Sequence, residues 1–248
     1  MADKLEQTKQ LAFWLNQIEK YERKFKKWED KSKKIVDRYV DERGEAAQRK
    51  AQFNILWSNV QTLLPALYSK QPVPNISRRY DDDKQLGLTV SRVLERAASY
   101  YVDTTYFNDI MRQTVLDRLL AGRGTTWVRY SPVFGDAVQE TDDELMPELY
   151  SEDVDLDFVH WEDFGHTVAK TWQEVRAVWR KVHLDRSELV KRFGEEIGNK
   201  IPISTSKDAA EGEMSNSVCV YEIWDKRNKR AIWVNQYRDW ETDRKSVV

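Results

Sequence analysis

The sequence predicts an α+β protein in which long helices are followed by a mixed region of helices and strands. A run over residues 3–43 contains neither proline nor glycine, and its apolar side chains recur every three or four residues, as on one face of a helix. After residue 125 the apolar side chains alternate with polar ones, which is typical of half-buried strands. The end of the chain is expected to form a β-hairpin.

The composition indicates a folded chain with substantial cores. Its 248 residues are 40% hydrophobic and 12% aromatic, enough for one large domain or two small ones. The net charge of −2 argues against a strong electrostatic grip on nucleic acid. The single cysteine, Cys219, excludes an internal disulfide, and no run approaches the roughly 20 apolar residues of a membrane span. Since no secretory signal opens the chain either, we expect a soluble protein of intracellular origin.

Residues 1–44 are expected to form one long, charged helix with heptad spacing. Large aromatics fit poorly into a two-stranded coiled coil, so we expect this helix to pack on its own domain, against the next helix. A dedicated zipper over residues 11–39 remains the alternative. The seam is interrupted by Ser32 and consists of Leu11, Trp14, Ile18, Tyr21, Phe25, Trp28, Ile35 and Tyr39.

Three further helices are expected before the strands, over residues 45–69, 84–102 and 105–121. The first is expected to bury a wide apolar face and to kink at Pro65, before Pro72 and Pro74 impose an extended segment. Gly122 is expected to end the third. The apolar faces are Phe53, Leu56, Trp57, Val60, Leu63, Leu64 and Leu67 in the first helix, Leu88, Val93, Leu94, Ala97, Ala98 and Tyr101 in the second, and Phe107, Ile110, Met111, Val115 and Leu119 in the third.

The remaining elements are mostly strands. Alternation predicts strands over residues 125–130, 153–161 and 175–184, and a hairpin over 217–237. A short helix between the last two is marked by Asp185 as N-cap, Glu188 three residues later and Gly194 as its end.

No motif for catalysis or cofactor binding stands out, so we expect no enzyme and no catalytic, cofactor-binding or metal site. Phosphate-binding glycine motifs are missing, and "GRG" at 122–124 is interpreted as a helix end. The histidines at 160, 166 and 183 lack the spacing of ligands on one helix face, and no second cysteine joins Cys219 in a zinc site. The lysine-rich "KFKKWEDKSKK" is interpreted as a solvated helix flank.

Two carboxylate clusters keep a metal-dependent nuclease open as an alternative. Asp81, Asp82 and Asp83 are consecutive, and Asp153, Asp155 and Asp157 recur at every second residue. An EF-hand would need glycine and glutamate where Phe158 and Phe164 stand. Strand alternation with a solvated face explains the second cluster more simply.

The order of several blocks resembles the N-terminal part of portal proteins of short-tailed bacteriophages. These blocks, within residues 45–237, are "FNILWSNVQTLLPALYSKQPVP", "LERAASYYVD", "AGRGTTWVRYSP", "DFVHWEDFGHT", "TWQEVRAVWRKVHLDRSELVKRFG" and "VYEIWDKRNKRAIWV". The resemblance implies a wing-like region of a head-to-tail connector subunit. About twelve identical subunits would form a ring at one capsid vertex. A near-neutral subunit suits a conduit through which DNA slides.

The resemblance also implies partners and location. They are the terminase motor, capsid and scaffolding proteins, tail adaptor proteins and double-stranded DNA bound without sequence recognition, in a virion assembled in the bacterial cytoplasm, with no membrane. The stem and clip are expected beyond Tyr237, and residues 238–248 are expected to be a non-native tail from sequencing read-through. No DNA-contacting residue can be transferred to this sequence. A helical adaptor or scaffolding protein that pairs through residues 11–39 remains the other alternative.

Overall fold

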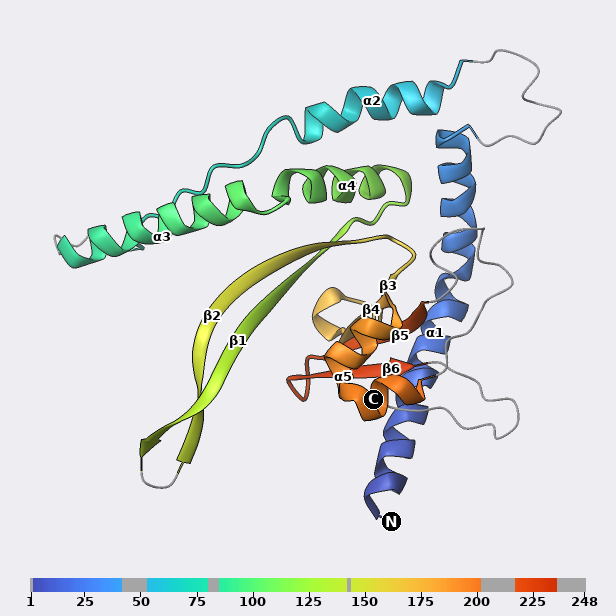
Figure 1. Cartoon of the computed structure of the whole chain (residues 1–248). Coiled ribbons are helices and arrows are strands. Elements are labelled where there is room, and N and C mark those ends of the chain that lie inside the picture. Colours follow the sequence, from blue (N-terminus) through green and yellow to red (C-terminus); the bar gives the residue numbers. More distant parts are fainter. Residues whose placement is uncertain (1, 42–52, 80–84, 142–143, 202–216, 236–248) are drawn as a thin grey trace. The chain divides into compact units, whose positions relative to one another are not determined.

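The computed structural model confirms the α+β class and describes residues 2–41, 53–79, 85–141, 144–201 and 217–235. Figure 1 shows the order of the elements along the chain. Contacts between Cα atoms group the chain into two compact units. One unit combines residues 1–31 with 162–248, and the other consists of residues 32–161.

The first unit is built on a four-stranded antiparallel sheet with the order β3-β4-β5-β6. The hairpin expected near the end of the chain is confirmed in its described part by β5 and β6. The short strand β3 was not predicted, and it pairs with the beginning of β4. The strands are β3 (Phe164–His166), β4 (Ala177–Leu184), β5 (Val218–Asp225) and β6 (Arg230–Asn235).

Helix α1 (Ala2–Tyr39) uses the first half of its heptad seam to cover one face of this sheet. Packing on its own domain is therefore confirmed. Packing against the next helix was wrong for this half of the seam, but at the end of α1 the side chain of Gln61 in α2 donates to the hydroxyl of Tyr39 at 3.0 Å. The sheet is the better partner because its own large side chains match the bulky seam residues of the helix. The shared core consists of Leu11, Trp14, Leu15, Ile18 and Tyr21 from α1 and Ala177, Trp179, Tyr221, Ile223 and Val234 from the sheet.

Helix α5 (Arg186–Lys200) forms a second core with the sheet, centred on the fully buried Leu189. The predicted N-cap is confirmed, because the Asp185 carboxylate accepts from the backbone N–H of Glu188 at 2.7 Å. That hydrogen bond lowers the pKa of Asp185 below its ordinary value. Gly194, with φ 81°, interrupts the helix instead of ending it, and helical structure resumes and runs to Lys200.

The second unit contains the three helices α2 (Ile55–Leu67), α3 (Gln85–Thr104) and α4 (Phe107–Leu120). The predicted start of α2 near residue 45 lies outside the described residues. Pro65 stands in the last turn of α2, and the helix ends two residues later, at Leu67. Gly122 adopts φ 79° directly after α4, which confirms it as the helix end.

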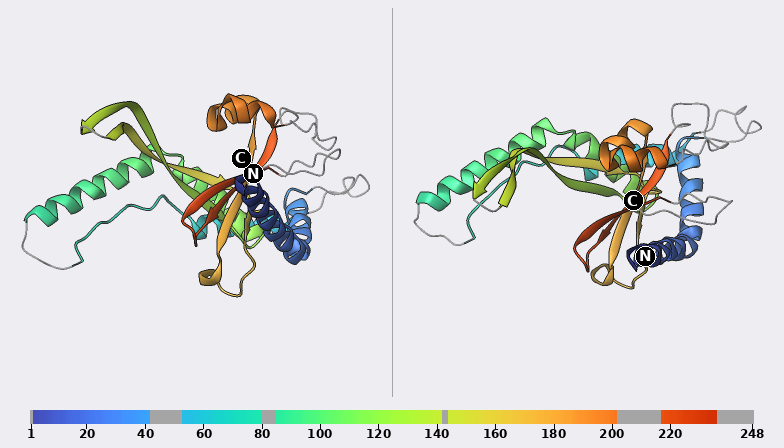
Figure 2. Two further views of the ribbon diagram at one scale, coloured as in Figure 1. Left: turned by 90° about the horizontal axis from the view of Figure 1, so that it is seen from below. Right: turned by 60° about the horizontal axis from the view of Figure 1, so that its bottom comes forward.

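Strands β1 (Thr125–Thr141) and β2 (Glu144–Val159) form a long antiparallel ribbon that extends well beyond the predicted strands. Figures 1 and 2 show the two strands running side by side as a curved, twisted arm. The base of the ribbon lies against α4. There Gly124 approaches the α4 backbone so closely that a Cβ would collide with the carbonyl of Thr114.

A buried carboxylate ties the end of the ribbon to α4. Asp117 Oδ2 accepts from the backbone N–H of Trp161 at 3.0 Å, and Arg123 donates to the Trp161 carbonyl at 2.6 Å. Burial raises the pKa of Asp117, although the charges of His160 and Arg123 and the Trp161 N–H act against this rise. The folded state therefore favours the protonated carboxyl, and the stability that this gives is lost as the pH rises through the folded-state pKa.

We expect Asp117→Asn to fold at neutral pH with a stability no lower than that of the parent, because the amide oxygen still accepts from Trp161 and no charge is buried. Asp117→Leu should lose about 1–3 kcal/mol, because it leaves that N–H unpaired. Urea denaturation between pH 4 and pH 8 measures both effects. A stability of Asp117→Asn as low as that of Asp117→Leu would show that the negative charge itself is what stabilises this junction.

Candidate interaction surface

Helix α3 exposes a continuous row of apolar side chains, and none of the residues of this helix is buried. Each member of the row lies three or four residues from another member, and together they occupy one face about a third of the helix circumference wide. Five of them are between 47% and 76% exposed. We call this row the α3 stripe; it consists of Leu86, Val90, Val93, Leu94, Ala97 and Tyr100.

The opposite face of α3 is held by the extended segment that precedes it. Glu95 accepts from the backbone N–H of Ile76 at 3.2 Å, and the amide of Gln71 donates to the Val102 carbonyl at 3.3 Å and to the Asp103 carboxylate at 2.8 Å. The polar side of the helix is thus fixed by hydrogen bonds, and the α3 stripe on the other side is exposed to solvent. The segment is extended as Pro72 and Pro74 predicted, but it forms no strand over residues 71–79.

The apolar face predicted to be buried in α2 is also largely exposed, so that prediction was wrong. Val60 is the one fully buried residue of this helix. Trp57 is half exposed, and Leu63 and Leu67 are similarly open. The physical reason is that α4 covers only part of the α2 circumference. Two of the three helices of this unit therefore present apolar surface to solvent.

Between Val128 and Pro132, one side of the ribbon is mainly apolar and the other is mainly polar, because successive side chains on each strand point to opposite sides. The cross-strand pairs Val128–Leu156 and Tyr130–Val154 place four apolar residues on the same side. Helix α4 covers the base of this side, where the hydroxyls of Thr114 and Thr126 lie 3.0 Å apart. Farther out it is open. We call this open part the ribbon apolar face; it consists of Val128, Tyr130, Pro132, Val154 and Leu156.

The other face of the ribbon carries the second carboxylate cluster. Arg129 lies between two of its members, 3.1 Å from Asp155 and 3.9 Å from Asp157, and Ser131 donates to Asp155 at 2.6 Å. Asp153 continues the row and is exposed. An arginine between the carboxylates balances their charge, as expected for a solvated strand face. No group that could hold a metal ion occurs among the described residues; Asp81, Asp82 and Asp83 lie outside them.

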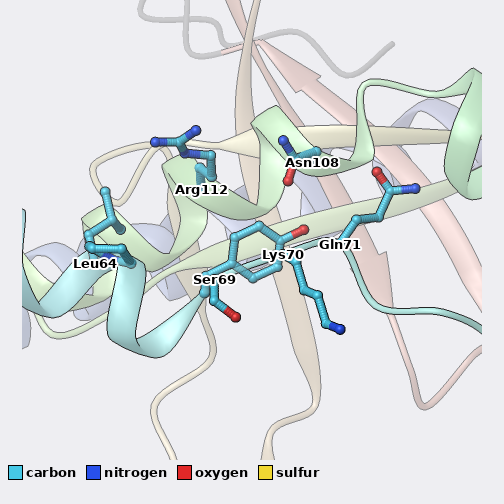
Figure 3. A pocket seen from close by; sticks show the side chains of 8 residues that line it. Leu64, Ser69, Lys70, Gln71, Asn108 and Arg112 are labelled. Atoms are coloured by element: carbon cyan, nitrogen blue, oxygen red, sulfur yellow. The ribbon is translucent and has the colours of Figure 1, made fainter.

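A cavity of about 270 Å³ lies where the end of α2 meets α4, and Figure 3 shows its lining. Lys70 and Arg112 give it two positive charges, but their charged ends point in different directions, so they do not converge on one anion. The cavity is open and mostly polar. The side chains that line this cavity do not converge on one ligand and do not form a catalytic group.

The histidines, the cysteine and the lysine-rich segment singled out in the sequence do not form a common site. His160 lies at the ribbon end and His166 in an aromatic cluster with Tyr21 and Phe25, while His183 is exposed. Burial raises the pKa of Cys219 to about 11, so its thiol is poorly reactive. The lysines of residues 24–34 are exposed, as expected for a solvated flank.

One arginine beside the α3 stripe was not predicted from the sequence. Arg96 is exposed and lies at one border of the stripe, three residues after Val93 and four residues before Tyr100. This spacing from two apolar positions on a helix is the signal that could have identified it. Leu88 and Ala98 were predicted on the apolar face of this helix, but their helical positions place them off the stripe.

Within the described residues, no helix has the length and apolarity to cross a membrane. Comparisons with known proteins identify no relative: no family model matches the chain, and no curated protein matches it significantly. The candidate site is therefore defined by geometry alone, as two separate apolar surfaces on one unit.

Proposed function

We propose that this chain is a structural subunit of a phage portal ring, which serves as the DNA conduit and the head-to-tail connector at one capsid vertex. The observation that carries the proposal is the exposed apolar surface of the second unit, on α3 and on the ribbon. Exposed apolar patches of this kind mark sites of protein association. Two unlike surfaces on one chain suit a head-to-tail ring, in which each copy uses both.

The order of the sequence blocks that resemble portal proteins supplies the biological assignment. The charge distribution agrees with it, because the lysines of α1 are interspersed with acids and the ribbon carries more carboxylates than the single Arg129 that pairs with two of them. A conduit for DNA should not grip the duplex tightly. Partners in this role would be further copies of the chain, the terminase motor, capsid and scaffolding proteins, and tail adaptors.

Native mass spectrometry of the full-length product of the gene, combined with particle images, tests this proposal. We expect a closed ring of about a dozen subunits with a central hole. A species that remains a monomer or dimer over a wide range of concentrations would contradict the proposal. Incubation with DNA and Mg²⁺ or Mn²⁺ should leave the DNA intact. Cleavage lost on replacing Asp153, Asp155 and Asp157 together would instead establish the nuclease alternative.

A further inference from the structure

We propose that the α3 stripe of one copy packs on the ribbon apolar face of the next copy, so that subunits join head to tail through these two surfaces. This contact presupposes the proposed ring and would be its lateral contact. A second copy of this chain would occupy both surfaces.

The two surfaces are similar in length. By the rise per residue, the α3 stripe from Leu86 to Tyr100 extends over about 21 Å and the ribbon apolar face from Val128 to Pro132 over about 14 Å. The ribbon apolar face can therefore cover about two thirds of the stripe. A helix stripe packed on a sheet face is also one of the standard ways in which two elements bury apolar surface.

Charge favours this pairing over the pairing of two identical stripes. Arg96 borders the α3 stripe, and Glu152 lies at the outer end of the ribbon apolar face, where it accepts from Tyr130 at 2.7 Å. Among the described residues, Arg96 has no acidic partner within the same chain. Two α3 stripes laid together would bring two like charges to one contact, whereas the ribbon presents a carboxylate to Arg96.

The contact also explains why both surfaces are exposed in a single chain. The polar side of α3 is anchored by Gln71 and by the Ile76 backbone, so the helix presents its stripe outward before any partner arrives. The ribbon is attached at its base to α4 and presents its apolar face in the same way. Because the two surfaces differ, each copy can offer one to each neighbour, and the contact propagates.

Chemical cross-linking of the full chain tests the contact. Val93→Cys in the stripe and Val128→Cys in the ribbon replace two valines of nearly equal exposure, 59% and 56%. A short bis-maleimide reagent should give a covalent dimer when the two variants are mixed, and no dimer with either variant alone. The native Cys219 adds little background, because burial disfavours its thiolate. A protein that carries both substitutions should give a ladder of covalent multimers.

Matched controls make the result specific. Ser151→Cys places an exposed thiol on the ribbon at a position paired with Val133, on the charged side. Mixed with Val93→Cys, it should give no dimer, and a yield equal to that of Val128→Cys would overturn the inference. Dimers formed by Val93→Cys alone would also overturn it, in favour of paired stripes. Arg96→Glu should lower the yield, and Glu152→Arg in the other copy should restore it.

The cross-linking experiment and the test for ring formation can give different results. Rings that form without the Val93–Val128 product would overturn this contact and leave the portal assignment standing. Cross-linked head-to-tail chains that never close into a ring would support the contact and contradict the portal assignment.

Discussion

Arg180→Met is expected to destabilise the sheet unit by about 3–5 kcal/mol, because it leaves the carboxylate of Glu222 buried without its charged partner. The two residues are cross-strand neighbours on β4 and β5, and Arg180 Nε donates to Glu222 Oε2 at 2.7 Å. Both are almost fully buried. Trp224 also donates to this carboxylate, at 2.9 Å, but cannot neutralise it. Urea denaturation followed by circular dichroism measures the loss.

Two control variants show whether the buried charge of Glu222 causes the loss of stability in Arg180→Met. The double variant Arg180→Met with Glu222→Leu removes both charges and should recover most of the lost stability, because buried ion pairs and apolar pairs of similar size are often equivalent. Arg23→Met breaks the exposed pair between Arg23 and Glu19 and should cost about 1 kcal/mol or less. Equal losses in all three variants would mean that the buried charge is not the cause.

Trp14→Ala is expected to cost about 3–5 kcal/mol and to loosen α1 from the sheet. Trp14 is 1% exposed and is among the largest side chains fully enclosed in the core between α1 and the sheet. Its removal creates a cavity on the helix side of that core. Hydrogen exchange should therefore rise along α1 more than in β5 and β6, and the unfolding midpoint should fall.

The neighbouring Phe13 provides the control for the Trp14 experiment. Phe13 is 37% exposed, and its ring lies 4.8 Å from the guanidinium of Arg176. Phe13→Ala should cost about 1 kcal/mol, the scale of an exposed cation–π contact with little packing. If Phe13→Ala and Trp14→Ala were equally destabilising, α1 would not be held mainly by its buried seam.

The ends of helices and strands that are set by a few neighbouring residues were predictable from the sequence. The N-cap at Asp185 with Glu188, the left-handed Gly122 after α4 and the turn between β5 and β6 each need only a few neighbouring residues. The length of the β1–β2 ribbon was underestimated, because its register shifts between Val133 and Thr141 break the simple alternation.

The packing partners of amphipathic helices were not predictable in the same way. A heptad seam shows which side of α1 is apolar, but a sheet and a second helix are equally able to cover it. For the same reason, the apolar face of α2 was expected in a core. In a protein that associates with copies of itself, such a face can remain open in one chain and be buried in the assembly. Amphipathicity identifies the surface, and only the tertiary structure shows that it is free.

The division of the first unit between both ends of the chain has a consequence for synthesis. Tyr21 and the rest of the α1 seam leave the ribosome long before Val234, their partner on β6. At translation rates of about 5–20 residues per second, the interval is roughly 10–40 s. The nascent helix therefore waits with its tryptophans and tyrosines uncovered, while the second unit can already fold behind it. A chaperone that shields this helix during translation would raise the yield of native protein more than one supplied after release.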